Sequence, residues 1–179
     1  MSGGEHTVAL IALLYLPVAI TALMMVLETG AKAGVPAAVR LRRVYMNSSS
    51  TARLAAVGML VSATIHLALV PSQWTEDPLR AVLFFLDGVA LSAVAVAAVM
   101  LGIQAWRPAA LVLLSAGIVS YASYVLAGVE EPDSVGVTAK LVELAVIGLV
   151  LVGSSRHVGS GGSRFRSRLL PKAIGGLFQ

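Results

Sequence analysis

Six polar side chains that can bind ions or carry protons stand inside or beside long apolar stretches of this chain: His66, Asp87, Tyr121, Tyr124, Lys140 and Glu143. Ionisable groups are costly at membrane depth, so such residues are the first candidates for a functional site. A histidine and two carboxylates on different helices can bind a cation or pass protons between them. The sequence therefore predicts a polar site for an ion or for protons within the membrane.

Two other interpretations of these residues stay open. His66, Asp87 and Glu143 are also candidate ligands of a divalent transition metal, although no spacing in the sequence enforces a coordination geometry. In a purely structural interpretation, Lys140 reaches the membrane surface, Glu143 neutralises it, and a His66–Asp87 hydrogen bond fixes the register of two helices. Lys140 and Glu143 are three residues apart, a spacing that allows pairing on one helix. The sequence identifies no cofactor.

The composition sets the environment of this site. Hydrophobic residues make up 58% of the 179 residues and charged residues 12%, with a mean hydropathy of +0.88. An ordinary soluble domain is about half apolar and about a quarter charged. The chain is therefore expected to be a membrane protein. It contains no cysteine, which excludes disulfides, thiolate metal sites and a cysteine nucleophile.

Five apolar stretches reach the length of about 20 residues that crosses a bilayer. They cover residues 7–27, 52–71, 79–101, 108–127 and 137–153. Each is apolar all round, as expected for helices that contact both lipid and other helices. The expected fold is an all-α transmembrane bundle of five spans within residues 1–154, with a basic loop at 28–51 and a flexible basic tail at 155–179.

Positive charge is distributed unevenly between the two sides of the expected bundle. Eleven Lys and Arg residues fall on the side of the basic loop and the tail, against Arg80 and Lys140 on the other. The positive-inside rule then places the N-terminus outside and the tail in the cytoplasm, as in a bacterial inner-membrane protein. We expect the basic side to contact anionic lipids. The basic tail adjoins a membrane helix and no nucleic-acid-binding fold, so no nucleic-acid partner is expected.

Local signals mark the ends of the expected helices. Asp77-Pro78 has the pattern of an N-cap followed by proline at the first helical position, and Arg107-Pro108 is placed similarly. Residues 47–51 offer several caps, and residues 36–46 predict a short surface helix with arginines toward headgroups and Leu41, Val44 and Tyr45 toward acyl chains. Trp74 and Trp106 are expected to anchor opposite membrane interfaces.

Two helix faces are predicted to contact other helices. Gly58, Ser62 and His66 recur every four residues on one face, and Ala116, Ser120 and Tyr124 do so on another. Small residues at this spacing allow close helix packing. We therefore expect a helical subunit or packing partner of a larger membrane complex, or a homo-oligomer. The alternative is a small cation- or proton-linked carrier or channel.

Motifs for enzymatic chemistry are missing from the sequence. It contains no phosphate-binding glycine loop, no serine nucleophile elbow and no HExxH zinc motif. His66 also has no matched nucleophile nearby in the sequence. This favours a protein that is not an enzyme, while an intramembrane hydrolase stays open.

One run of residues resembles a group of small uncharacterised bacterial polytopic membrane proteins. It is His66-x4-Pro71-x-Gln73-Trp74-x-Glu76, about twenty residues long with the Phe84-Phe85 pair that follows it. In that group a similar histidine-to-glutamate outer turn joins two helices, and a second histidine often stands where this chain has Gln73. The resemblance implies an architecture and no activity.

Overall fold

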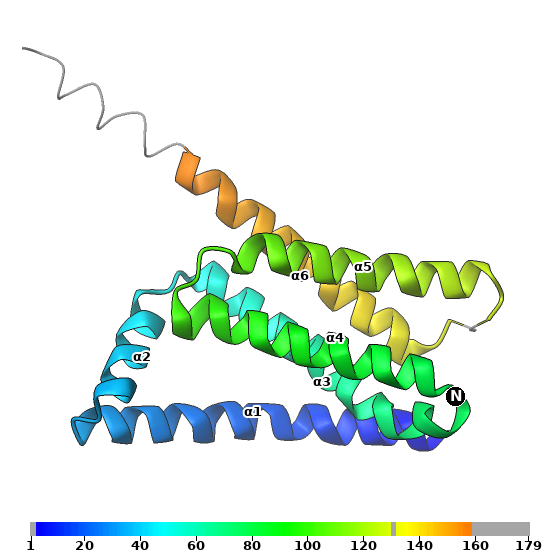
Figure 1. The fold of residues 1–179 in the computed structure, drawn as a ribbon, viewed down its shortest axis with the longest axis horizontal. Coiled ribbons are helices and arrows are strands. Elements are labelled where there is room, and N and C mark those ends of the chain that lie inside the picture. The colour runs from blue at the N-terminus through cyan, green and yellow to red at the C-terminus, as the bar shows by residue number, and fades with distance from the viewer. Residues whose placement is uncertain (1–2, 130–131, 159–179) are drawn as a thin grey trace, which may run out of the picture.

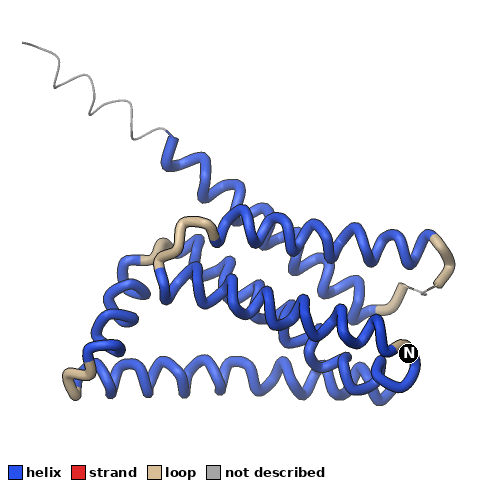
Figure 2. The backbone as a smooth tube through the Cα atoms, viewed as in Figure 1, coloured by secondary structure: helices blue, strands red, loops and turns tan. Residues whose placement is uncertain are grey.

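The computed structural model describes residues 3–129 and 132–158, in which helices are joined by short loops and no strand occurs (Figures 1 and 2). Its elements are α1 (Gly3–Lys32), α2 (Pro36–Asn47), α3 (Ser50–Glu76), α4 (Pro78–Val96), the π-helical segment η1 (Ala97–Leu101), α5 (Trp106–Leu126) and α6 (Ser134–Val158). Five helices are long and apolar enough to cross a membrane: α1, α3, α4 with η1, α5 and α6. The predicted all-α, multi-pass architecture is confirmed, and the predicted tail lies outside the described residues from position 159 onward.

The five long helices lie side by side with α3 at the centre, where it contacts α1, α4 and α6 (Figure 1). α5 completes the bundle against α4 and α6. The short helix α2 lies across one end, from the end of α1 to η1. We call this end, where α3 and α5 begin, the α2 end. At the opposite end α3 finishes and α4 and α6 begin.

The end of α3 differs from the prediction. We expected a span that finishes at Pro71 and a turn of several residues, but α3 continues to Glu76 and only Asp77 separates it from α4. Proline removes a single backbone hydrogen-bond donor, and the flanking turns keep theirs. Asp77 is the predicted cap of α4, because its side chain accepts a hydrogen bond from the Arg80 backbone N–H at 3.1 Å.

The other helix ends follow the predicted signals in part. Ser49 caps α3 by accepting a hydrogen bond from the Ala52 backbone N–H at 3.1 Å, as expected for the 47–51 segment. α5 begins at Trp106, two residues before the predicted start. Gly102 ends η1 with a φ of +64°, a conformation that glycine adopts without a steric penalty.

The short surface helix at 36–46 is confirmed as α2, but its apolar face contacts protein. Leu41 and Tyr45 pack against the buried core at the α2 end instead of pointing into acyl chains. Arg53 of α3 holds the last turn of α2 in place, because its guanidinium donates hydrogen bonds to the Tyr45 and Met46 carbonyls at 3.0 Å each. α2 is thereby fixed across the bundle.

The two tryptophans have different surroundings. Trp74 is 56% exposed near the opposite end, as an interfacial ring would be. Trp106 is only 8% exposed and belongs to the buried core at the α2 end. Its ring therefore packs mainly against protein, which differs from the expected interfacial anchor.

Close contact between α3 and α6 depends on a glycine. A Cβ atom at Gly58 would overlap Cγ2 of Val146. The core near this contact is apolar and includes Met59, Leu91 and Leu114, all almost fully buried. This packing sets the position of the polar residues one to two turns further along α3.

Candidate functional site

Three helices bring His66, Asp87 and Glu143 to the same level of the bundle. His66 lies ten residues before the end of α3 at Glu76, while Asp87 and Glu143 lie nine residues after the starts of α4 and α6. At about 1.5 Å per residue, each is about 14–15 Å from the opposite end. The span expected to end at Pro71 placed His66 only about 7 Å deep, so the longer α3 moves the site toward the middle of the bundle.

The His66 imidazole lies between two carboxylates. Its Nδ1 is 2.7 Å from Oδ2 of Asp87, and its Nε2 is 3.7 Å from Oε1 of Glu143. The imidazole ring also stacks on Phe84, with ring centroids 5.5 Å apart and an angle of 6° between planes. His66 is 4% exposed and Glu143 1% exposed, so both side chains lie in surroundings of low dielectric.

Glu143 is held by two further groups. Lys140, one turn earlier on α6, places Nζ 2.9 Å from both carboxylate oxygens. Ser62 of α3 donates its hydroxyl to Oε1 at 2.8 Å. The predicted Lys140–Glu143 pair is therefore confirmed, as is the prediction that Ser62 and His66 face another helix.

The formal charges of this cluster depend on one proton. With a neutral His66, the two carboxylates and Lys140 sum to −1, and a protonated His66 brings the sum to zero. Net charge is costly in a buried site. Asp87 is the most exposed member of the cluster, since its side chain is 24% exposed.

A cavity of about 320 Å³ connects the cluster to the opposite end of the bundle. His66 and Asp87 line its deep part, and Gln73, Arg80 and Asp133 line it nearer the helix ends. Ala116, Ser120 and Tyr124 also line it, as predicted for a face of α5 that points at other helices. The cavity thus extends from His66 and Asp87 toward one end of the bundle.

Aromatic rings of α5 cover the two cations that border the cavity. The Arg80 guanidinium lies 5.0 Å from the centre of the Tyr124 ring, and Lys140 Nζ lies 5.9 Å from that of Tyr121. Cations over aromatic faces are attracted by the ring quadrupole. Tyr124 of α5 thus contacts Arg80 of α4, and Tyr121 of α5 contacts Lys140 of α6.

Two glycines make room for these side chains. A Cβ atom at Gly117 would lie 3.3 Å from Oε2 of Glu143, and one at Gly136 would lie 2.9 Å from the Tyr121 ring. Neither contact leaves space for a larger residue without movement of the polar groups. The cluster therefore depends on small residues of α5 and α6.

The donor set does not fit a divalent metal. Within residues 3–129 and 132–158, no group of three or more His, Asp or Glu side chains is arranged to hold one. Lys140 occupies both oxygens of Glu143, so a cation there would compete with an ammonium group. The geometry therefore gives no support to a metal that needs several fixed ligands from His66, Asp87 and Glu143.

All six predicted candidates contribute to one site, since Glu143 completes the cluster and the other five line the cavity. We did not predict Gln73, Arg80 and Phe84 as site residues. Gln73 is buried and its Oε1 accepts a hydrogen bond from Arg80 at 3.5 Å. Its position seven residues after His66 on one helix face was the available signal, but it needed α3 to continue beyond Pro71.

Comparisons with protein-family models, with curated proteins and with solved structures find no match for this chain. The resemblance to small bacterial polytopic membrane proteins stays a prediction. In this chain the corresponding His66–Glu76 run forms the last part of α3 and is not a turn. The chemistry of the site is therefore argued from its own geometry.

Proposed function

We propose that this protein is a small proton- or cation-linked membrane carrier that uses His66 as its proton-binding group. The observation that carries the proposal is the imidazole held between Asp87 at 2.7 Å and Glu143 at 3.7 Å, deep in the bundle. Ionisable groups arranged in this way are typical of proton relays in membrane proteins.

The direction of access supports a carrier over an open channel. Among the described residues, the cavity extends from the cluster toward the opposite end, and the buried side chains of Met59, Leu91 and Leu114 lie between the cluster and the α2 end. An ion at His66 therefore meets an apolar barrier on one side. Passage across the bundle requires a rearrangement of helices, which is the defining step of a carrier.

Two exchange steps follow from the charges. A proton from the cavity side passes to Asp87 and then to Nδ1 of His66, and the cluster becomes neutral overall. A monovalent cation beside Asp87 balances the same charge and competes with the proton. The solute that accompanies the proton must fit a cavity of about 320 Å³ walled by tyrosines, Phe84 and Arg80.

Orientation follows from the basic residues of the α2 end. Lys32, Arg40, Arg42 and Arg43 lie there, and by the positive-inside rule they support a cytoplasmic α2 end, as in a bacterial inner-membrane protein. The cavity then opens to the outside. Because the chain has no cysteine, Ala37→Cys and Thr75→Cys are single labelling sites for an impermeant maleimide on intact cells. We expect Thr75→Cys alone to react, and reaction only of Ala37→Cys would reverse the orientation.

The test of the proposal is proton flux into liposomes that contain the purified protein and a trapped pH-sensitive dye. We expect an imposed gradient to drive flux in the wild type and no flux above protein-free liposomes for Asp87→Asn and His66→Ala. Glu76→Gln is the matched control, since it removes an exposed acid at the same end outside the cavity. Equal flux in all variants contradicts the proposal. The absence of proton, sodium and potassium flux in the wild type also contradicts it.

A second candidate function is that of a subunit in a larger membrane complex or homo-oligomer. The observation that favours it is the exposure of α1, in which Leu14, Tyr15 and Val18 are 74%, 68% and 63% exposed. Native mass spectrometry of the protein extracted in mild detergent tests it. A stoichiometric partner chain or second copy supports this function, and a lone stable monomer contradicts it.

A further inference from the structure

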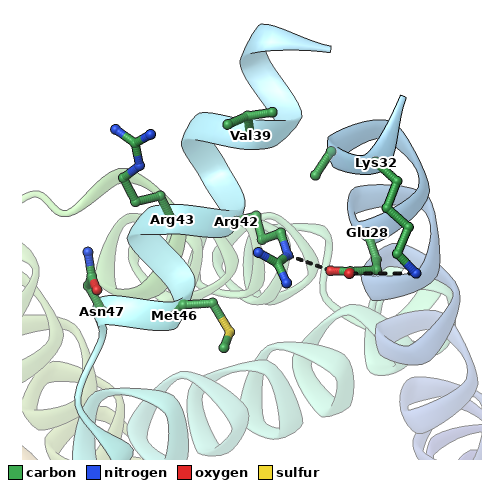
Figure 3. A pocket seen from close by; sticks show the side chains of 8 residues that line it. Glu28, Lys32, Val39, Arg42, Arg43, Met46 and Asn47 are labelled. Carbon is green, nitrogen blue, oxygen red and sulfur yellow. Dashed lines mark hydrogen bonds and ion pairs between the residues drawn. The ribbon is translucent and has the colours of Figure 1, made fainter. Parts of the chain in front are cut away.

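A second cavity lies at the α2 end, between the last turn of α1 and α2 (Figure 3). It has a volume of about 500 Å³ and is separate from the His66 cluster. Three cationic side chains line it: Lys32, Arg42 and Arg43. Glu28 is its single acid, so its formal charge is +2. A cavity with a net positive charge attracts an anion.

Glu28 orients one of these cations. Arg42 Nε donates to Glu28 Oε2 at 2.6 Å, and Lys32 Nζ lies 3.8 Å from Glu28 Oε1 (Figure 3). The contact uses Nε of Arg42, and the guanidinium carries two further NH₂ groups. A guanidinium held by a carboxylate is well placed to donate in parallel to a phosphate.

The other wall of the cavity is apolar. Val39 and Met46 of α2 also line the cavity, and each is three or four residues from Arg42 and Arg43, so it neighbours both arginines on the helix surface. The cavity also lies where α1, a helix long enough to cross a membrane, comes to its end at Lys32. A helix that crosses a bilayer ends at the level of the lipid headgroups. A ligand there meets basic and apolar groups together.

We propose that this cavity binds the headgroup of an anionic phospholipid, with its phosphate against Arg42 and Arg43 and its glycerol against Val39 and Met46. Surface binding of basic helices to anionic leaflets is a diffuse attraction. The site differs from that attraction because one acid positions one arginine at a defined cavity between two helices. The inference is independent of the His66 cluster, which lies at another level of the bundle.

The experiment is native mass spectrometry of the full chain in mild detergent, titrated with phosphatidylglycerol or with phosphatidylcholine of the same acyl chains. We expect the first phosphatidylglycerol to bind more tightly than phosphatidylcholine. Arg43→Gln is the main variant, because Arg43 takes part in no ion pair within the described residues and its loss leaves the Glu28–Arg42 contact intact. We expect it to weaken phosphatidylglycerol binding by about tenfold or more, as for one charge-assisted hydrogen bond.

Arg40→Gln is the matched control. It removes the same charge from an exposed position on the same helix that does not line the cavity. We expect phosphatidylglycerol binding to stay within about twofold of wild type, since Arg40 does not line the cavity and contributes only to the diffuse surface charge. Both variants should keep the wild-type melting temperature, and Arg42→Gln should repeat the effect of Arg43→Gln.

Three outcomes overturn the inference. Equal losses for Arg40→Gln and Arg43→Gln indicate diffuse surface charge and no site. Equal binding of the two lipids shows that the headgroup is not recognised. Displacement of bound phosphatidylglycerol by millimolar inorganic phosphate shows that the cavity takes a small free anion and not a lipid.

Discussion

Two carboxylates of this protein have nearly the same partners in different surroundings. Glu143 contacts Lys140 on its own helix and His66 from another, and Glu28 contacts Lys32 on its own helix and Arg42 from another. The Glu143 side chain is 1% exposed, whereas that of Glu28 is 41% exposed. Burial is therefore the main difference between these two carboxylate sites, and it determines the role of each.

A buried charge needs a partner of opposite charge, whereas an exposed charge is solvated by water and does not need one. At the Glu143 site, loss of a partner leaves a charge at low dielectric, so each group constrains the others. At the Glu28 site, water and salt screen the charges, so the pair contributes little to the fold and its arginine can contact a ligand. We expect substitutions at the first site to affect stability and proton exchange, and those at the second to affect lipid binding.

Lys140→Met gives the largest expected effect. It leaves Glu143 buried without its cation and should lower the free energy of unfolding by about 3–5 kcal/mol. Thermal unfolding in mild detergent measures this loss. Lys32→Met is the matched change at the exposed pair and should cost less than about 1 kcal/mol. The double variant Lys140→Met with Glu143→Gln should recover most of the stability, and equal losses at both lysines would remove the distinction between the sites.

Gly58→Ala tests the packing that brings the buried site together. The new Cβ overlaps Val146, so α3 and α6 must separate, at a cost of about 2–3 kcal/mol. Gly148→Ala is the control on α6, since nothing lies within 4 Å of a Cβ there. It should be neutral or slightly stabilising. A tolerated Gly58→Ala with unchanged proton flux would show that the position of the cluster does not depend on this contact.

Ser62→Ala removes the hydroxyl that donates to Glu143. Because Lys140 still compensates the carboxylate, we expect a smaller loss of about 1–2 kcal/mol in the free energy of unfolding. Ser123→Ala is the control, since its exposed hydroxyl bonds only the Val119 carbonyl of its own helix. If both variants lower the free energy of unfolding by the same amount, the Ser62 hydrogen bond has no special role in holding Glu143.

Glu28→Gln gives the smallest effect on stability. Its contact with Arg42 is exposed, so we expect only a small loss of stability, which should fall as salt is raised. Unfolding at low and high ionic strength measures both. A large loss that does not change with salt would place this pair among the structural contacts and weaken the contrast with Glu143.

Much of the fold was predictable because hydropathy reports membrane crossing directly. The Lys140–Glu143 pair and the Ser62–His66 face also followed from helical spacing, which needs no knowledge of other helices. The depth of His66 did not follow, because Pro71 is a strong local signal for a helix end and tertiary packing overrode it. The contact of Phe84 with His66 also requires the register of α3 against α4.

The most direct test of the central claim is nitrogen-15 NMR of the His66 imidazole in the reconstituted full chain, as a function of pH. His66 is distinguished from His6 and His157 by the His66→Ala variant. The account predicts reversible protonation of the ring by the solution, with a pH dependence that changes in Asp87→Asn. A ring that stays in one state across the range in which the protein is folded, unaffected by Asp87→Asn, would contradict it and make the cluster a static helix contact.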